Sequence, residues 1–251
     1  MAGIRRVLAT DIDGTLVGFG GESELADYVE NRAELGVIYL TGRTRHNAEA
    51  LIQRHGLPSP LALVTDTGAE IFWGQEFRAD DRWAFQQRKE WSPRRVQDAL
   101  TIVEGLSYIG RSSHWRLAYR VDSEECVKNA RAHLIRAGVA ARTFWDANDS
   151  RLDVLPRTAL KGRALCYVLQ QLRIKGQRCF VAGDAENDGD MLQGRYHGVL
   201  VANGALELQA KLPERIYRAS QPGALGVLEG LRRWFREDSV VHQISTPECV
   251  S

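Results

Sequence analysis

The chain has 251 residues, which is enough to bury one or two hydrophobic cores. Its 33 basic and 32 acidic residues nearly cancel, which excludes a broad electrostatic attraction to nucleic acid or to an anionic membrane. No apolar run reaches the ~20 residues that cross a bilayer, and the four cysteines form no CxxC pair. We therefore expect a cytoplasmic protein without nucleic-acid or membrane partners.

The first part of the chain alternates buried strands with amphipathic helices. Short apolar runs predict the strands, and apolar residues at helical spacing predict the helices. Such alternation is typical of a parallel sheet with helices on both faces. The expected order is strand 4–10, helix 22–35, strand 37–40, helix 47–55 and strand 61–64.

The pattern changes after about residue 75, where a polar, loop-like stretch covers 78–82. Ser92 and Pro93 are typical of an N-cap followed by proline in the first helical turn, and that helix is expected to run to about Glu104. Further elements are expected as strand 115–121, a helix from Ser123 to Gly138, and strands 139–145 and 151–155. We interpret this region as an α+β insert with the order helix, strand, strand, helix, strand, strand, in which only 115–121 of the first strand pair is assigned bounds.

The strand–helix alternation then resumes with helix 161–172, strands 178–182 and 198–202, and helix 223–235, while the polar last dozen residues are expected to fray. We therefore predict an α/β protein with a doubly wound parallel, Rossmann-like core and an inserted α+β cap. The core is expected to comprise residues 1–80 and 160–251, and the cap residues 81–159.

The sequence Asp11-Ile12-Asp13-Gly14 follows the first strand and carries two carboxylates close together. Like charges at this spacing repel and raise each other's pKa unless a cation lies between them. Mg²⁺ is suited to this position because it prefers oxygen ligands and keeps places for water and a phosphate. The motif therefore predicts phosphoryl transfer through an aspartate.

Other polar clusters follow strands or begin helices at Thr41-Gly42-Arg43, at Lys161 and at residues 184–188. Ligands of open parallel sheets bind outside the carboxyl ends of the strands, so we expect these clusters to meet at one edge. The expected catalytic residues are Asp11, Asp13, Thr41 and Lys161. The expected metal-binding residues are Asp11, Asp13, Asp184 and Asp188, and the expected phosphate-binding residues are Thr41, Gly42, Lys161 and Asn187.

Charge suggests a role for each group. Asp11 is expected to attack phosphorus and form an aspartyl phosphate. Asp13 is expected to protonate the leaving sugar oxygen and later to deprotonate water. Thr41 would hold phosphoryl oxygens, Lys161 would supply a positive charge, and Asp184 would complete the metal site.

Each cluster has an ordinary structural alternative, since Asp-x-Asp-Gly is common in turns and a single lysine is usually solvated. Two other protein classes are alternatives to an enzyme. They are a signalling receiver with a phospho-accepting aspartate, and a catalytically silent regulatory module of the same fold. The occurrence of all the reactive groups in this order favours an enzyme.

The ordered motifs DIDGT (11–15), LTGR (40–43), Lys161 and GDAENDGDM (183–191) resemble those of the haloacid-dehalogenase-like phosphohydrolases, and the insert is similar to that superfamily's type II cap. Four further stretches resemble the sucrose-phosphate phosphatases and related sugar-phosphate phosphatases. They are TGAEI (67–71), WRLAYRVD (115–122), LDVLPRTALKG (152–162) and GALGVLEGL (223–231).

This resemblance implies Mg²⁺ held by Asp11, the backbone carbonyl of Asp13, and Asp184. It implies hydrolysis of a sugar phosphate. The main expected substrate is sucrose 6-phosphate, and the alternatives are mannosylfructose phosphate and a glycosyl-phosphoglycerate. We expect a monomer, with a sugar-phosphate synthase as a candidate partner. The expected substrate-binding residues are Arg43, Glu70, Arg116, Asn148 and Arg151.

The chain departs from its relatives at one point beside the sugar. Some relatives carry glycine-lysine-aspartate just before the strand that corresponds to residues 152–155, whereas this chain has Asp149-Ser150-Arg151. The departure leaves the phosphate chemistry unchanged and bears on which sugar is bound.

Overall fold

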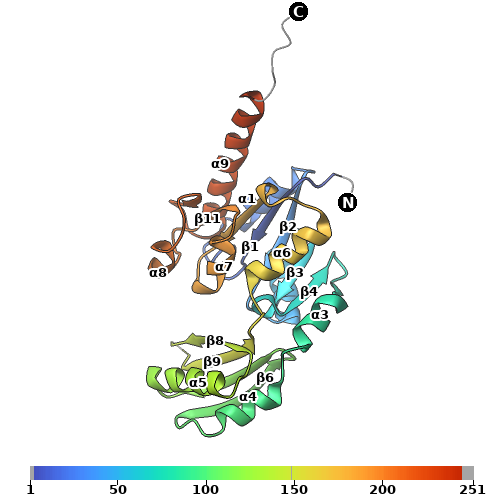
Figure 1. Cartoon of the computed structure of the whole chain (residues 1–251). Coiled ribbons are helices and arrows are strands. Elements are labelled where there is room, and N and C mark those ends of the chain that lie inside the picture. The colour runs from blue at the N-terminus through green and yellow to red at the C-terminus, as the bar shows by residue number, and fades with distance from the viewer. Residues whose placement is uncertain (1–2, 148, 245–251) are drawn as a thin grey trace, which may run out of the picture.

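The computed structural model describes residues 3–147 and 149–244, which form two β-sheets with flanking helices (Figure 1). The larger sheet has the strand order β12-β11-β10-β1-β2-β3-β4-β5. Its strands are β1 (Arg6–Thr10), β2 (Leu35–Leu40), β3 (Ala62–Thr65), β4 (Glu70–Trp73), β5 (Arg78–Ala79), β10 (Cys179–Gly183), β11 (His197–Leu200) and β12 (Ile216–Arg218).

Alternation along β1 shows that the larger sheet is covered on both faces. Leu8 packs in a cluster with residues of α1, α2 and α9, whereas Val7 and Ala9 pack in a second cluster with α6 and α7. Successive strand residues point to opposite faces, so this arrangement confirms the doubly wound core. The helices are α1 (Glu22–Glu30), α2 (Arg45–Arg54), α6 (Lys161–Leu172), α7 (Gly189–Leu192), α8 (Leu206–Gln209) and α9 (Gly223–Ile244).

Only one edge of the larger sheet is not parallel. Strands β12 to β3 pair in parallel, but β4 pairs antiparallel with β3, and β5 pairs antiparallel with β4. Neither β4 nor β5 was assigned from the sequence. The stretch 78–82, expected as a loop, contains β5 and the start of α3 (Asp81–Arg88). Asp80 caps this helix by accepting a hydrogen bond from the Trp83 backbone N–H at 2.8 Å, and the Trp83 side chain is buried against the core.

Two helix ends also differ from expectation. The helix expected over 22–35 ends at Glu30, where the Asn31 amide donates to the Asp27 carbonyl at 2.8 Å and Leu35 already begins β2. The last helix, expected to end at Phe235, continues to Ile244. It extends from the upper end of the molecule, opposite the smaller sheet (Figure 1).

The smaller sheet is antiparallel, with the order β6-β7-β9-β8, and forms the cap together with α4 (Pro93–Leu100) and α5 (Glu124–Arg136). Ser92 and Ser123 accept hydrogen bonds from backbone N–H groups at these helix starts, which confirms the cap predicted at Ser92. The first helix ends at Leu100, before the expected Glu104. The cap strands are β6 (Leu106–Ser113), β7 (Arg116–Val121), β8 (Ala141–Asp146) and β9 (Arg151–Pro156).

The connections into and out of the cap meet beside Gly68, whose carbonyl accepts from the Trp83 indole N–H at 3.0 Å. Gly68 has φ +108°, and a Cβ placed on it would lie 2.4 Å from the Leu160 carbonyl oxygen. Only glycine fits this conformation and this approach without strain. Although Trp83 packs with the core, the domain boundaries at 80/81 and 159/160 stay a prediction.

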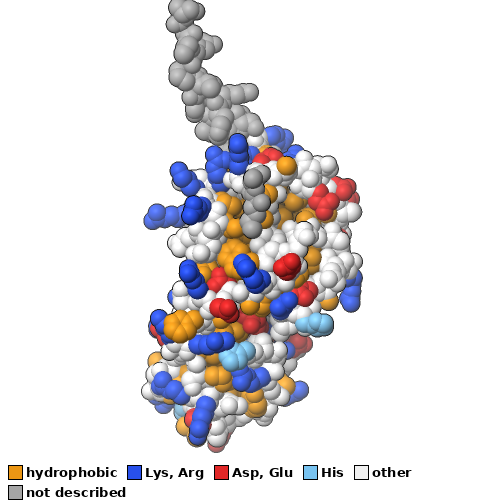
Figure 2. Space-filling view, turned by 90° about the vertical axis from the view of Figure 1, so that its right-hand side faces the viewer, with side chains coloured by type: hydrophobic (Ala, Val, Ile, Leu, Met, Phe, Trp, Pro, Cys, Tyr) orange, Lys and Arg blue, Asp and Glu red, His pale blue; other side chains and the backbone are white. Residues whose placement is uncertain are grey.

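No helix in the described part of the chain is long and apolar enough to cross a membrane. Figure 2 shows one face of the molecule, where basic and acidic side chains alternate with apolar patches. This mixture agrees with the nearly balanced net charge.

Candidate active site

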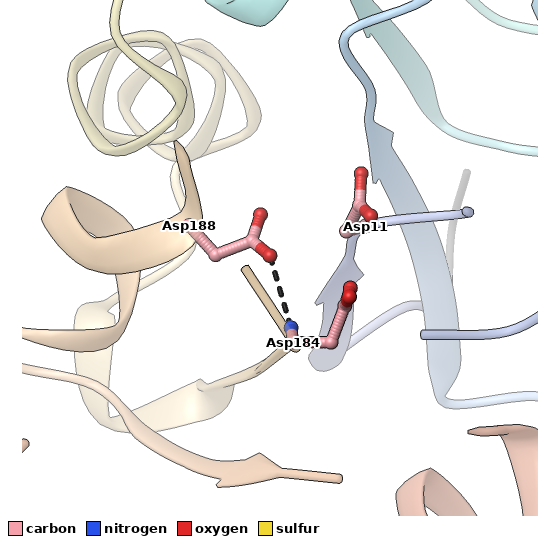
Figure 3. Close-up of side chains that lie close together, drawn as sticks. All are labelled: Asp11, Asp184 and Asp188. Carbon is pink, nitrogen blue, oxygen red and sulfur yellow. Dashed lines mark hydrogen bonds between the residues drawn. The ribbon is translucent and has the colours of Figure 1, made fainter. Parts of the chain in front are cut away.

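The acidic residues predicted to meet lie at adjoining strand ends. Strands β1 and β10 pair in parallel with Thr10 opposite Ala182, and the Asp11 backbone N–H donates to the Ala182 carbonyl at 3.0 Å. Asp11 follows β1, and Asp184 follows β10. Parallel pairing therefore brings residues 173 positions apart in the sequence to the same sheet edge (Figure 3).

Lys161, the first residue of α6, is fully buried and joins two of these acids. Its Nζ lies 2.6 Å from Asp11 Oδ1 and 2.6 Å from Asp188 Oδ1. Burial acts to lower the pKa of Lys161, but the charges and hydrogen bonds of the two carboxylates outweigh it and raise the pKa above its ordinary value. The amine is therefore protonated.

The third acid, Asp184, is held by a residue to which the sequence assigned no role. The Thr15 hydroxyl donates a hydrogen bond to Asp184 Oδ1 at 2.6 Å. Asp188 Oδ2 accepts from the backbone N–H groups of Asp184 at 3.0 Å and Ala185 at 3.1 Å, and the first bond is dashed in Figure 3. Carboxylate oxygens of Asp11, Asp184 and Asp188 lie within 4.8 Å of one another.

The electrostatics of this cluster favour a divalent cation. Burial raises the pKa of Asp11 well above its ordinary value, and the neighbouring Asp188 and Asp184 raise it further against the pull of Lys161. Burial, followed by the charge of Asp188, raises the pKa of Asp184 to about 6. Three carboxylates face one ammonium, and their oxygen donors are those that Mg²⁺ prefers. The residues present therefore fit a magnesium ion.

Asp13 lies apart from the acidic cluster and is paired with Arg43. Arg43 Nε donates to Asp13 Oδ2 at 2.8 Å and Nη2 donates to Oδ1 at 2.6 Å, while both side chains stay partly exposed. The hydrogen bonds that Arg43 donates to Asp13 raise the pKa of Arg43 above its ordinary value. Thr41 is buried after β2, and its hydroxyl accepts from the Arg43 backbone N–H at 3.0 Å. This loop therefore borders both Asp13 and the cluster.

A cleft of about 450 Å³ lies beside these groups and is lined by residues of the core and of the cap. Seven predicted site residues line it, five from the core and two from β7 and β9 of the cap, and β6 adds Ser112, which was not predicted. Its lining residues are Asp11, Asp13, Gly42, Arg43, Thr44, Asn47, Ser112, Arg116, Arg151, Ala185 and Asn187.

Glu70, expected to touch the sugar, does not line the cleft. Its carboxylate accepts from the Thr65 hydroxyl at 3.1 Å and from the Trp115 indole N–H at 3.2 Å, so it joins the core to the cap. Arg151 donates to Asp153 at 2.8 Å at the cleft wall. The predicted contact Asn148 lies outside the described residues.

Arg116 also joins the two sheets. Its Nη2 forms an ion pair with Asp66 Oδ1 at 2.8 Å and donates to the Gly42 carbonyl, while Nη1 lies 3.4 Å from Asp153. Asp66 is fully buried, and burial raises its pKa to about 6 despite the opposing charge of Arg116. Asp66 was not predicted, and its only signal is its position directly before the TGAEI stretch.

Comparisons with known proteins agree with this geometry. The sequence profile of the family described as sucrose-6F-phosphate phosphohydrolase matches residues 4–235. The mannosylfructose-phosphate phosphatase of Agrobacterium fabrum is 28% identical over 242 residues, covering 91% of this chain and 96% of that protein. The probable sucrose-phosphatase 1 of Arabidopsis thaliana is 26% identical, and the match covers 90% of this chain but only 59% of the plant protein.

Solved structures give the same result. The sucrose-phosphatase of Synechocystis, solved with sucrose and phosphate, superposes with a TM-score of 0.82 at 26% identity, covering 92% of this chain and 98% of that one. A haloacid-dehalogenase subclass IIB sugar phosphatase shares the fold, with a TM-score of 0.66 at 16% identity over 94% of this chain and 99% of that one. The chain therefore belongs to the sucrose-6F-phosphate phosphohydrolase family and is a haloacid-dehalogenase-like sugar-phosphate phosphatase.

Proposed function

We propose that the chain hydrolyses sucrose 6-phosphate in a Mg²⁺-dependent reaction that passes through a phosphoryl group on Asp11. The observation that carries this proposal is the position of protonated Lys161 between Asp11 and Asp188, with Asp184 in the same cluster. The Lys161 charge supports a carboxylate that must remain anionic in order to attack phosphorus. Asp11 also lines the cleft, so its carboxylate borders the space where a phosphate would enter.

The two aspartates of the first motif have different surroundings and therefore different roles. An oxygen of buried Asp11 forms a bond to phosphorus as the bond from phosphorus to the sugar oxygen breaks. Asp13, which lines the cleft, enters this step protonated and released from the Arg43 fork that holds it in the absence of substrate, and it gives that proton to the departing sugar oxygen. Asp13 then removes a proton from the water that attacks phosphorus and releases Asp11.

The metal would be held by Asp11, the Asp13 backbone carbonyl and Asp184, with Asp188 orienting the site. When bound, Mg²⁺ supplies positive charge that offsets the repulsion between the carboxylates and the phosphate dianion. Asp188 already has Lys161 and two backbone N–H groups as partners, so its proposed contribution is orientation rather than nucleophilic attack.

The phosphoryl oxygens would be bound by Thr41, Gly42, Lys161 and Asn187. Asn187 lines the cleft, and its side-chain Oδ1 is buried without a hydrogen-bond partner in the described structure. A Cβ on Gly42 would lie 3.8 Å from Asn187 Nδ2, so the two residues are direct neighbours in the lining of the cleft.

The sugar would lie between core and cap. Arg43, Arg116 and Arg151 line the cleft and are placed to contact sugar hydroxyls, whereas Glu70 would act by docking Trp115 of the cap. The match to a structure solved with sucrose and phosphate supports sucrose 6-phosphate. The match to the mannosylfructose-phosphate phosphatase over 96% of its length supports mannosylfructose phosphate as the second candidate.

One assay tests the proposal. Phosphate release by the purified full chain should be measured with Mg²⁺ on sucrose 6-phosphate, mannosylfructose phosphate, a glycosyl-phosphoglycerate and a hexose phosphate. We expect the highest kcat/KM with sucrose 6-phosphate. Preference for another sugar phosphate would correct the substrate, and no release from any of them would support the silent regulatory module instead.

A further inference from the structure

The loop after β11, residues 201–205, contacts both segments that carry the proposed metal ligands. Asn203 Nδ2 donates to the Gly14 carbonyl at 2.8 Å. The Ala205 backbone N–H donates to the Asp184 carbonyl at 2.8 Å. One short loop therefore joins the DIDGT segment to the segment that follows β10.

The Asn203 side chain also accepts a hydrogen bond at its other end. Its Oδ1 accepts from the Gly223 backbone N–H at 2.9 Å, at the start of α9. The amide is therefore oriented by two backbone partners, with its donor toward Gly14 and its acceptor toward α9. Because the two ends have different partners, a substitution can remove one contact and keep the other.

Gly14 is a position where a small backbone movement reaches the metal site. It has φ +77°, and a Cβ on it would lie 2.6 Å from Asp184 Oδ2, so its backbone packs directly against that carboxylate. The Gly14 peptide connects Asp13 to Thr15, and Thr15 donates to the other oxygen of Asp184 at 2.6 Å. Rotation of this peptide would displace Asp13 on one side and Thr15 on the other.

We propose that Asn203 is a positioning residue, which fixes the Gly14 carbonyl and thereby sets Asp13 and Thr15 relative to Asp184. The proposal rests on the proposed function for the roles of Asp13 and Asp184. Misplacement of reacting groups by about 1 Å lowers a reaction rate by about 100-fold, so the Asn203 amide can affect the rate strongly without touching the substrate.

The test is Asn203→Asp, which keeps an acceptor for Gly223 and replaces the donor by an oxygen that repels the Gly14 carbonyl. We expect kcat on the sugar phosphate to fall by about 10- to 100-fold with KM changed by less than about threefold. We also expect Mg²⁺ affinity, measured by calorimetry without substrate, to weaken by about tenfold, since the metal-site geometry is disturbed.

Asn31→Asp is the matched control, because the Asn31 amide also donates to a backbone carbonyl at 2.8 Å but lies at the end of α1, away from the site. We expect this control to keep wild-type kcat and Mg²⁺ affinity. A second variant, Asn203→Ala, removes the donor and the acceptor without introducing a charge and serves if Asn203→Asp fails to fold. It should show the same direction of change in both measurements.

Wild-type kcat and Mg²⁺ affinity in a folded Asn203 variant would overturn the positioning role, as would an equal loss in Asn31→Asp. If the wild-type chain released no phosphate from any sugar phosphate, the proposed function would fail. The Mg²⁺ titrations of the Asn203 variants would still decide whether Asn203 shapes the metal site.

Discussion

At the scale of single residues, the site is a balance between buried like charges and one buried cation. Lys161 is fully buried, which is tolerated because Asp11 and Asp188 each lie 2.6 Å from its Nζ. The raised pKa values of Asp11 and Asp184 show that burial leaves these carboxylates short of positive charge. A cation that enters the cluster therefore relieves an existing electrostatic cost.

Asp11→Asn should abolish turnover while the fold persists. The amide cannot form the acyl phosphate, so we expect kcat to fall by at least about 1,000-fold. The chain should still fold, because Asp188 stays as an anionic partner of Lys161 and the amide oxygen of the variant can still accept from Nζ. Circular dichroism and phosphate release check both results, and appreciable turnover in the variant would exclude Asp11 as nucleophile.

Asp66 should make the free energy of unfolding depend on pH. Its pKa in the folded chain is about 6 against an ordinary value of 3.8, so the folded state favours the protonated acid. Its stabilising contribution is present below pH 3.8 and is lost as the pH rises through about 6.

The Asp66→Asn variant removes this titration. Denaturant titrations at a series of pH values give the free energy of unfolding. Between pH 4 and pH 7, this free energy should rise in the variant relative to the wild type by up to about 3 kcal/mol. Parallel pH curves for the two proteins would show that Asp66 does not titrate in this range.

At the scale of elements, local sequence predicted those segments whose signals are themselves local. The helix Lys161–Leu172 was predicted with both ends correct, because its apolar spacing is complete within the segment. The cap at Ser92 was predicted for the same reason. Helix α3 was missed because its stability depends on Trp83, which packs against core residues distant in sequence.

The cluster of Asp11, Asp184, Asp188 and Lys161 was predictable from the order of motifs, but the contacts that hold it were not. Thr15, Asp66 and Asn203 act through partners from 50 to 189 residues away, and no spacing rule identifies such pairs. Glu70 was predicted at the sugar because the resemblance implied it, whereas its bond to the Trp115 indole depends on how the cap docks.

Strand β7 of the cap contacts the core through Arg116, and this contact can be tested by mutation. Arg116→Lys replaces a fork that contacts Asp66, Asp153 and the Gly42 carbonyl by a single ammonium. We expect KM for the sugar phosphate to rise by about three- to tenfold, since one lost charged contact costs about 1 kcal/mol.

The control for this variant is p-nitrophenyl phosphate, a small ester that has no sugar to be held by the cap. Its KM should change less than the KM of the sugar phosphate in Arg116→Lys. Equal changes with both substrates would show that Arg116 acts on the phosphate loop alone.

At the scale of the whole molecule, the cleft requires both sheets. The core supplies the acidic cluster and the loop Thr41-Gly42-Arg43, while Ser112, Arg116 and Arg151 come from the cap. Sequence analysis predicted this division of core and cap from the change of pattern near residue 75. The cap thereby forms one wall of the space in which chemistry is proposed to occur.

Removal of Mg²⁺ should abolish activity of the whole enzyme. EDTA should lower phosphate release by at least about 100-fold, because the carboxylates and the phosphate dianion then repel without compensation, and added Mg²⁺ should restore it. Full rates in EDTA would remove the metal from the mechanism.

The contact between Gly68 and Leu160 has a consequence for how this protein can vary. Leu160 directly precedes Lys161, so any bulk at position 68 pushes on the backbone that delivers the ammonium to Asp11. A glycine 93 positions before the lysine thus acts as a spacer for the ion pair. If caps were exchanged between relatives, the core would keep its chemistry only if the close approach of residue 68 to the backbone of residue 160 were preserved.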